Sequence, residues 1–233
     1  MKYPEKEAVN EEKVIDADHD SIPLQRKRVF VKVNNISITN DDFRQLRDHE
    51  YISIPVVNLV LSLQKTDPQK VFLFNTIDHE FVNNLSDEIL ESMYSIAGFY
   101  PMWVCPFIHQ QHFVLFIVHL HSQRMTFDES CVLVFNSLKE INSGYELHIN
   151  FLKRLSSLLN CNFDSTKIYH VNVPQQSGCD CGCCLCFFEK EYTETMPSNL
   201  FQTNALFAKR EMKQLMDNYR QVMVEMLMNY KSF

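Results

Sequence analysis

The chain has 233 residues, of which 45% are hydrophobic and 22% charged, and its formal net charge is −7. This length favours one globular domain that buries its core without disulfide bonds. The acidic balance argues against nucleic acid or an anionic membrane as partner, because both require a basic surface. We find no apolar run of roughly 18 residues that would span a membrane and no secretory signal pattern, so we expect a nuclear or cytoplasmic, reducing location.

The first third of the chain predicts a charged arm followed by a strand and a capped helix. Residues 1–28 are polar and strongly charged, and we expect a flexible N-terminal arm ahead of one domain over residues 29–233. The β-branched run VFVKV at 29–33 predicts a strand. Thr39 followed three residues later by Asp42 predicts a capping box at a helix N-terminus.

Helices and strands then alternate without internal repeats. Pro55 is typical of the first turn of a second helix, and residues 70–76 predict a strand. Apolar spacing over residues 81–97 predicts a helix. Two strands follow at 102–107 and 112–120, and the second is so continuously apolar that we expect it in the centre of a sheet.

The second half predicts a hairpin partner for that central strand and then mostly helices. Residues 131–138 predict the partner strand, 145–159 an amphipathic helix and 168–173 a further strand. The segment from Cys181 to Pro197 predicts a helix, and residues 204–229 predict a long C-terminal one. The fold class is therefore α+β, with a central, mostly antiparallel sheet flanked by helices.

Cysteine is concentrated in one short segment, where five of the eight cysteines lie within residues 179–186. A tetrahedral zinc site usually takes two ligand pairs from separated segments, and no second pair exists, so we expect no metal there. We interpret Cys183, Cys184 and Cys186 as small buried hydrophobic residues of a helix.

Cys181 is the best candidate for a nucleophile. Gly178 and Gly182 bracket Cys179, Asp180 and Cys181, and glycine lets a substrate chain approach closely. A cysteine at the start of a helix lies at the positive end of the helix dipole, which favours the thiolate. Asp180 either orients this loop or simply caps the turn.

A nucleophilic cysteine needs a histidine base and a third group that orients the imidazole. His112 begins the predicted central strand and is the first candidate for the base, with His109 in reserve. We expect His119 and His121 to be structural or surface residues. Asn136 ends the partner strand, where its amide oxygen is able to accept the imidazole N–H.

Together these segments resemble the sentrin/SUMO-specific proteases, which are ubiquitin-like-protein cysteine peptidases related to adenovirus protease. That family shows His-Trp, later Asp-Ser, then Gln-x-Asn-x-x-Asp-Cys-Gly. This chain has His112-Phe113, Asn136-Ser137 and a segment from Gln175 to Gly182 in the same order. The resemblance covers roughly residues 29–190, and it implies a papain-like cysteine protease fold of the adenain type.

The chain departs from the family pattern at five positions. Asn136 replaces the family Asp, which keeps a hydrogen-bond acceptor but removes a charge; papain-like enzymes use Asn in this role. Phe113 and Tyr51 replace two tryptophans that roof the family's diglycine slot, so both positions remain aromatic. Ile54 replaces an Asp that contacts the modifier protein, and Ser177 replaces the Asn of the cysteine motif.

The resemblance implies a thiol protease or isopeptidase that cleaves after the C-terminal diglycine of SUMO or a related ubiquitin-like modifier. It assigns catalysis to Cys181, His112, Asn136 and Gln175, and substrate binding to Phe113, Tyr51, Trp103 and Gly182. Expected partners are the modifier and its lysine-conjugated targets, with no cofactor, metal, nucleic acid or membrane, and we expect a monomer.

Two other functions stay open on the sequence alone. A pseudoprotease that binds a ubiquitin-like modifier without cleaving it would explain the loss of the Asp at Asn136 and at Ile54. The same cysteine–histidine geometry also serves processing or acetyltransferase enzymes, since acyl groups are transferable to acceptors other than water.

Overall fold

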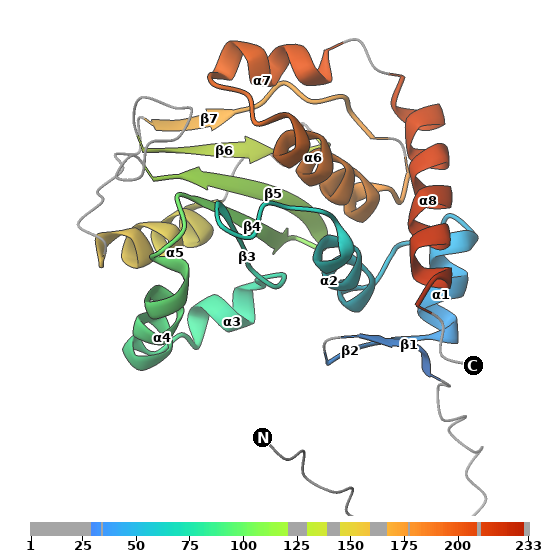
Figure 1. The fold of residues 1–233 in the computed structure, drawn as a ribbon, viewed down its shortest axis with the longest axis horizontal. Helices are drawn as coiled ribbons and strands as arrows, with labels where there is room; N and C mark the ends of the chain where they lie inside the picture. The colour runs from blue at the N-terminus through green and yellow to red at the C-terminus, as the bar shows by residue number, and fades with distance from the viewer. Residues whose placement is uncertain are drawn as a thin grey trace, which may run out of the picture.

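A five-stranded mixed sheet forms the centre of the computed structural model, which describes residues 29–33, 35–120, 130–138, 145–158, 167–176, 178–208 and 211–230. The predicted arm at 1–28 lies outside these residues. The strands lie in the order β3–β4–β5–β6–β7 (Figure 1). Their bounds are β3 (Val71–Leu73), β4 (Met102–His109), β5 (His112–His119), β6 (Cys131–Phe135) and β7 (Ile168–His170).

The antiparallel part of the sheet is its middle. β5 pairs antiparallel with both β4 and β6, as the apolar run predicted, whereas the outer strands β3 and β7 pair parallel with their neighbours. The outer strands are only three residues long, and their parallel pairing follows from the helical segments that connect each of them to its neighbour in the sheet. A separate hairpin is formed by β1 (Val29–Val33) and β2 (Ile36–Thr39).

Eight helices are described, and most of them pack on the two faces of the sheet (Figure 1). The first four are α1 (Asn40–Arg47), α2 (Ile54–Leu63), α3 (His79–Asn83) and α4 (Asp87–Ala97). The others are α5 (Glu146–Ser157), α6 (Cys181–Thr195), α7 (Leu200–Phe207) and α8 (Met212–Met228). The predicted capping box is present: Thr39 Oγ1 accepts from the Asp42 N–H at 3.2 Å, and the Thr39 N–H donates to Asp42 at 2.9 Å.

Two predicted helices are each divided in two. The helix expected over 81–97 is interrupted before Ser86, whose hydroxyl caps α4 by accepting from the Ile89 N–H at 3.3 Å. The helix expected over 204–229 ends as α7 at Phe207 and resumes as α8 at Met212. Apolar periodicity alone does not reveal such breaks, since the buried faces of the two parts continue the same stripe.

Alternation along the strands produces two hydrophobic cores, one on each face of the sheet. One core joins alternate residues of β4, β5 and β6, such as Val104 and Leu115, to α2, α6 and α8. The other joins the intervening residues, such as Trp103 and Phe116, to α4 and α5. No described helix is long and apolar enough to cross a membrane.

Candidate active site

Cys181 is the first residue of α6, as the sequence predicted, and only 4% of its surface is exposed. The preceding turn contains Gly178 with φ of 76°, a left-handed conformation that favours glycine. The thiol accepts hydrogen bonds from the main-chain N–H groups of Phe113 and Gly182. The sulfur therefore lies against the start of β5, the strand that begins with His112.

His112 is held by a direct hydrogen bond to Asn136. Its Nε2 lies 2.7 Å from Asn136 Oδ1, and both side chains are buried. Because Oδ1 also accepts the Leu138 N–H at 2.9 Å, this contact requires the Nε2–H tautomer of neutral His112. The other ring nitrogen, Nδ1, is then unprotonated and suited to accept a proton.

The Asn136 amide is built into its loop. Its Nδ2 donates to the carbonyl of Leu138 at 2.7 Å and to the hydroxyl of Tyr145 at 2.7 Å. These bonds fix the orientation of the amide, so that the oxygen faces the imidazole. An aspartate at this position would set a carboxylate oxygen against the Leu138 carbonyl oxygen.

Cys181 and His112 line the same pocket, which has a volume of about 470 Å³. The walls come from four regions of the chain: Tyr51 and Ile52 before α2, the β4–β5 turn with Phe113, Leu138 after β6, and the cysteine loop. The pocket is therefore formed by residues of α6 and β5 together with Leu138 from the segment that follows β6.

Burial shifts both reactive groups toward their neutral forms. It raises the pKa of the Cys181 thiol, and the main-chain N–H groups of Phe113 and Gly182 offset this effect only in part. Burial also lowers the pKa of His112, although the hydrogen bond that His112 donates to Asn136 opposes this, and the nearby His109 lowers it further. Burial thus acts against the thiolate that the position of Cys181 at the start of a helix favours.

Gln175 and Gln176 occupy different positions from the ones the motif suggested. Gln175, to which the resemblance assigns a catalytic role, directs its amide to the Val173 carbonyl at 3.1 Å. Gln176 lines the pocket, and its Oε1 accepts from the Ser137 hydroxyl at 2.5 Å. Gln176 thereby joins the Asn136 loop to the cysteine loop.

The four predicted substrate contacts separate into two groups. Phe113 and Tyr51 line the pocket, and Tyr51 is 62% exposed, whereas Trp103 and Gly182 do not line it. Trp103 is fully buried in the core on the opposite face of the sheet, where its indole N–H donates to Ala97 O at 2.8 Å. The substrate-binding assignment of Trp103 is therefore wrong. Successive side chains of a strand point to opposite faces of the sheet, and Trp103 points to the face that α4 and α5 cover.

Gly182 is a packing glycine beneath the pocket floor. A Cβ atom at this position would lie 2.5 Å from Cγ1 and 2.6 Å from Cδ1 of Ile52, which lines the pocket. The residue thus lets α6 approach the segment before α2, and its effect on substrate passes through Ile52.

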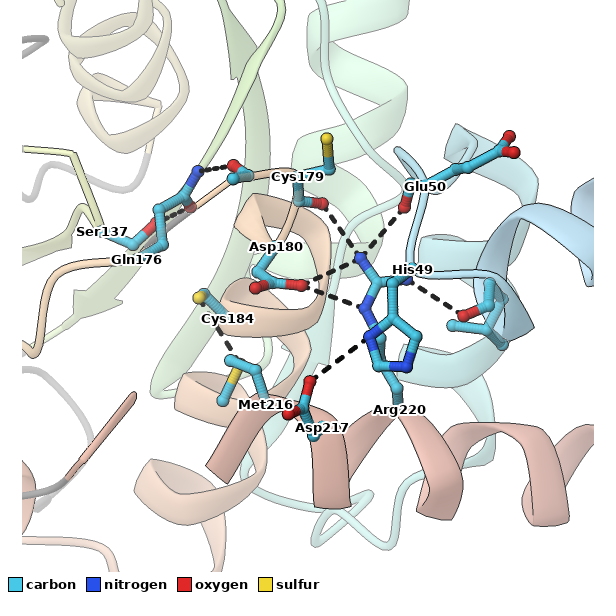
Figure 2. A network of polar contacts seen from close by, with 12 residues as sticks. His49, Glu50, Ser137, Gln176, Cys179, Asp180, Cys184, Met216, Asp217 and Arg220 are labelled. Atoms are coloured by element: carbon cyan, nitrogen blue, oxygen red, sulfur yellow. Dashed lines mark hydrogen bonds and ion pairs between the residues drawn. The ribbon is translucent and has the colours of Figure 1, made fainter. Parts of the chain in front are cut away.

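Arg220 of α8 joins the loop that precedes Cys181 to the segment after α1 (Figure 2). Its side chain is 2% exposed, and Nη2 lies 2.9 Å from Asp180 Oδ1. The same guanidinium donates to the carbonyls of Cys179 at 3.1 Å, Glu50 at 3.0 Å and Leu46 at 3.1 Å. Asp180 therefore orients the cysteine loop through an ion pair, and its side chain makes no N-cap hydrogen bond.

No sequence pattern indicated a role for Arg220, since a single arginine in an amphipathic helix normally faces solvent. The reserve base His109 is buried outside the pocket lining, in contact with His79. His119 is structural: its Nε2 lies 2.6 Å from the Tyr192 hydroxyl. Cys183, Cys184 and Cys186 are buried in the core as predicted, while His121 and Ser177 lie outside the described residues.

Comparison with solved structures shows the same fold in SUMO protease domains. The domain of yeast Ulp1 in complex with Smt3 superposes with a TM-score of 0.61 at 18% identity, covering 89% of this chain and 90% of that one. A de-sumoylating protease gives 0.58 at 18% identity, covering 88% and 93%. The Ulp1-like SUMO protease catalytic domain of Chaetomium thermophilum gives 0.56 at 14% identity, covering 91% and 85%.

This chain has the Ulp1-type protease fold. Comparison with protein-family models and with curated proteins finds no match. The expected papain-like, adenain-type fold class is thus confirmed. At such identities the shared fold does not carry substrate or activity with it, so these rest on the geometry of the site.

Proposed function

We propose that this protein is a thiol isopeptidase that cleaves after the C-terminal diglycine of a ubiquitin-like modifier of the SUMO class. The observation that carries the proposal is that His112, which lines the same pocket as Cys181, is held by Asn136 at 2.7 Å. A decayed enzyme would have no reason to keep the nucleophile and the base in one pocket and an amide that orients the base.

The reaction begins with transfer of the Cys181 proton to Nδ1 of His112. The sulfur attacks the carbonyl carbon of the modifier's last glycine, and the oxyanion is stabilised by the Cys181 N–H and the Gln175 amide. One such donor is worth about 2.7–4 kcal/mol of barrier. For this role Gln175 must exchange its bond to Val173 O for the oxyanion. His112 then protonates the leaving lysine amine, and water hydrolyses the thioester.

Specificity for a diglycine tail follows from the pocket walls. Tyr51 and Phe113 supply aromatic surface, and Ile52 and Leu138 supply apolar surface near the nucleophile. A slot lined in this way admits a chain without side chains and excludes bulkier residues. The surface that would contact the body of the modifier includes Ile54, where the family has a charge.

Electrophilic probes test both cleavage chemistry and modifier identity. Purified protein is incubated with vinyl sulfones of SUMO, ubiquitin and other modifiers, and covalent adducts are measured by mass spectrometry. We expect an adduct with a SUMO-class probe at Cys181, none in Cys181→Ser, and a retained adduct in Cys179→Ser. Labelling of Cys179 instead, or of no cysteine by any modifier probe, would contradict the proposal.

The second candidate function is a modifier-binding protein without catalysis, favoured by the neutral Asn136. One set of measurements distinguishes this binder from the proposed isopeptidase. The binder would form a complex with a modifier by calorimetry, and both the wild type and Cys181→Ser would leave a modifier–fluorophore conjugate uncleaved.

A further inference from the structure

Three histidines from three separate elements converge on the far side of the β4–β5 turn from Cys181. His79 is the first residue of α3, His109 the last of β4, and His148 lies in α5. One ring nitrogen from each lies within 4.8 Å of the other two. The ring centroids are separated by 5.6 Å for His79–His109, 5.1 Å for His79–His148 and 5.5 Å for His109–His148.

We propose that His79, His109 and His148 form a binding site for a divalent transition metal of the zinc class. Zinc binds imidazole nitrogen at about 2.0–2.1 Å, which places neighbouring ligand nitrogens of a tetrahedral site about 3.3 Å apart. His79 Nε2 and His109 Nδ1 are 3.4 Å apart, close to that edge. The other two nitrogen–nitrogen separations are at most 4.8 Å. Rotation of the exposed His79 adjusts its distance to His148, and the His109 ring would have to approach His148 by up to about 1.5 Å.

The environment of His148 is an independent indication of a missing ligand. The residue is completely buried, and neither ring nitrogen makes a hydrogen bond of ordinary length and angle, the nearest polar group being the Ile108 backbone. Buried polar groups without partners are rare and costly, and an absent ion is one of the few explanations. Phe107 packs against this ring at a centroid distance of 4.5 Å and fixes its position in the core.

The outer side of the cluster is open to a cation. A pocket of about 450 Å³ is lined by His79 together with Asp78, Glu80 and the Gln110–Gln111 turn. Two carboxylates beside the exposed histidine favour entry of a positive ion. Three protein ligands and an open fourth position correspond to a site that keeps one water on the metal.

Metal binding at this position would join α3, the end of β4 and α5. α3 and α5 contribute to the core on the face of the sheet opposite α6. The proposed site is therefore separate from the Cys181 pocket but adjacent to it, since Gln110 and Gln111 line both. The site is distinct from the cysteine cluster as well, because it contains no sulfur ligand.

Cobalt substitution tests the site directly. Protein treated with chelator is titrated with Co²⁺ and followed by visible absorption, and Zn²⁺ affinity is measured by calorimetry. We expect tetrahedral cobalt bands without thiolate charge transfer, displaced by one equivalent of Zn²⁺. His79→Ala should weaken Zn²⁺ binding at least about tenfold, since even outer partners of a metal site are worth that much.

Two further variants keep the test decisive. His148→Phe replaces the buried ring with one of similar shape beside Phe107, and it should fold and also lose binding. His49→Ala removes an exposed histidine elsewhere and should bind as the wild type does. Absence of cobalt bands in the wild type, wild-type affinity in His79→Ala, or a charge-transfer band that disappears in Cys179→Ser would each overturn the proposal.

Discussion

Both polar atoms of the Asn136 amide make hydrogen bonds to the surrounding residues. The oxygen orients His112 and accepts the Leu138 N–H, while the nitrogen donates to Leu138 O and to Tyr145. An aspartate satisfies the first two contacts and repels the Leu138 carbonyl. The asparagine is therefore a residue to which the surrounding loop is adapted.

Substitution of Asn136 separates orientation from charge. Asn136→Ala should lose most of the hydrolysis rate, because His112 loses the bond that fixes its tautomer. Asn136→Asp should keep activity but lower the free energy of unfolding by about 1–3 kcal/mol, since the Leu138 carbonyl is left without its donor. Turnover of a modifier–fluorophore conjugate and urea unfolding measure the two effects. Full activity in Asn136→Ala would remove Asn136 from the catalytic group.

The reactivity of Cys181 should follow its raised pKa. Alkylation by iodoacetamide, quantified at Cys181 by mass spectrometry, should rise continuously from about pH 6 to about pH 9, because the thiolate form grows with pH. Asn136→Asp should shift this rise to lower pH, since a carboxylate stabilises the imidazolium that accepts the thiol proton. A rate that is already constant below neutral pH would instead indicate a preformed thiolate–imidazolium pair.

At this scale, the sequence was informative where chemistry depends on a local motif. Cys181 and His112 line one pocket, and Asn136 contacts His112, as the order of the motifs predicted. Trp103 and Gln175 were less predictable, because strand face and side-chain rotamer depend on packing from distant segments. No motif indicated Arg220, because its four hydrogen-bond partners lie at distant positions of the sequence, between 46 and 180.

At the scale of elements, the distance between α6 and the segment before α2 depends on Gly182. The added methyl group of Gly182→Ala would push Ile52 toward the pocket that it lines. We expect a tenfold or greater loss of kcat/KM together with a destabilisation of about 1–3 kcal/mol, the usual result of overpacking. The double variant Ile52→Ala/Gly182→Ala removes the clash and should regain part of the activity. Unchanged kinetics in Gly182→Ala would show that α6 shifts freely.

Helix α8 acts on the site through a single side chain. Removing Arg220 leaves the Asp180 carboxylate without its cation and frees the carbonyls of Cys179 and Glu50. Arg220→Met should therefore cost about 3–5 kcal/mol of stability, as breaking one partner of a buried pair does. Arg220→Lys should restore part of the stability and little of kcat, since one ammonium does not reach all the acceptors of a guanidinium.

A matched control uses an arginine on the surface. Arg44 forms an exposed ion pair with Glu50 at 3.2 Å, and Arg44→Met should change stability by less than about 1 kcal/mol. Equal effects of the Arg44 and Arg220 substitutions, measured by urea unfolding and kcat, would contradict a special role for Arg220.

At the scale of the whole molecule, the two-sided sheet was predictable and the breaks in its helices were not. The run at 112–120 is apolar at successive positions, which requires cover on both faces, and all eight residues of β5 are buried. The breaks before α4 and after α7 depend on caps and turns, which the apolar stripe does not encode. The mixed pairing of the outer strands likewise depends on connections between distant segments.

Burial of Glu189 of α6 makes the free energy of unfolding depend on pH. Neither carboxylate oxygen of this fully buried residue has a hydrogen-bond partner, and burial raises its pKa from 4.5 to about 8. Between these values the unfolded chain is ionised and the folded one holds its proton. Stability therefore falls as pH rises through this window, by an amount on the order of 5 kcal/mol.

Replacing Glu189 with glutamine removes this titration while keeping the size of the side chain. Urea unfolding of Glu189→Gln should show a smaller loss of stability between about pH 5 and about pH 8 than the wild type, because an amide binds no proton in this range. Glu91→Gln, at an exposed position of α4, should leave the wild-type profile unchanged. If the wild type and Glu189→Gln showed the same dependence on pH, Glu189 would have to be ionised inside the core. A buried charge without a partner is far more costly than a shifted pKa, so we expect the profiles to diverge.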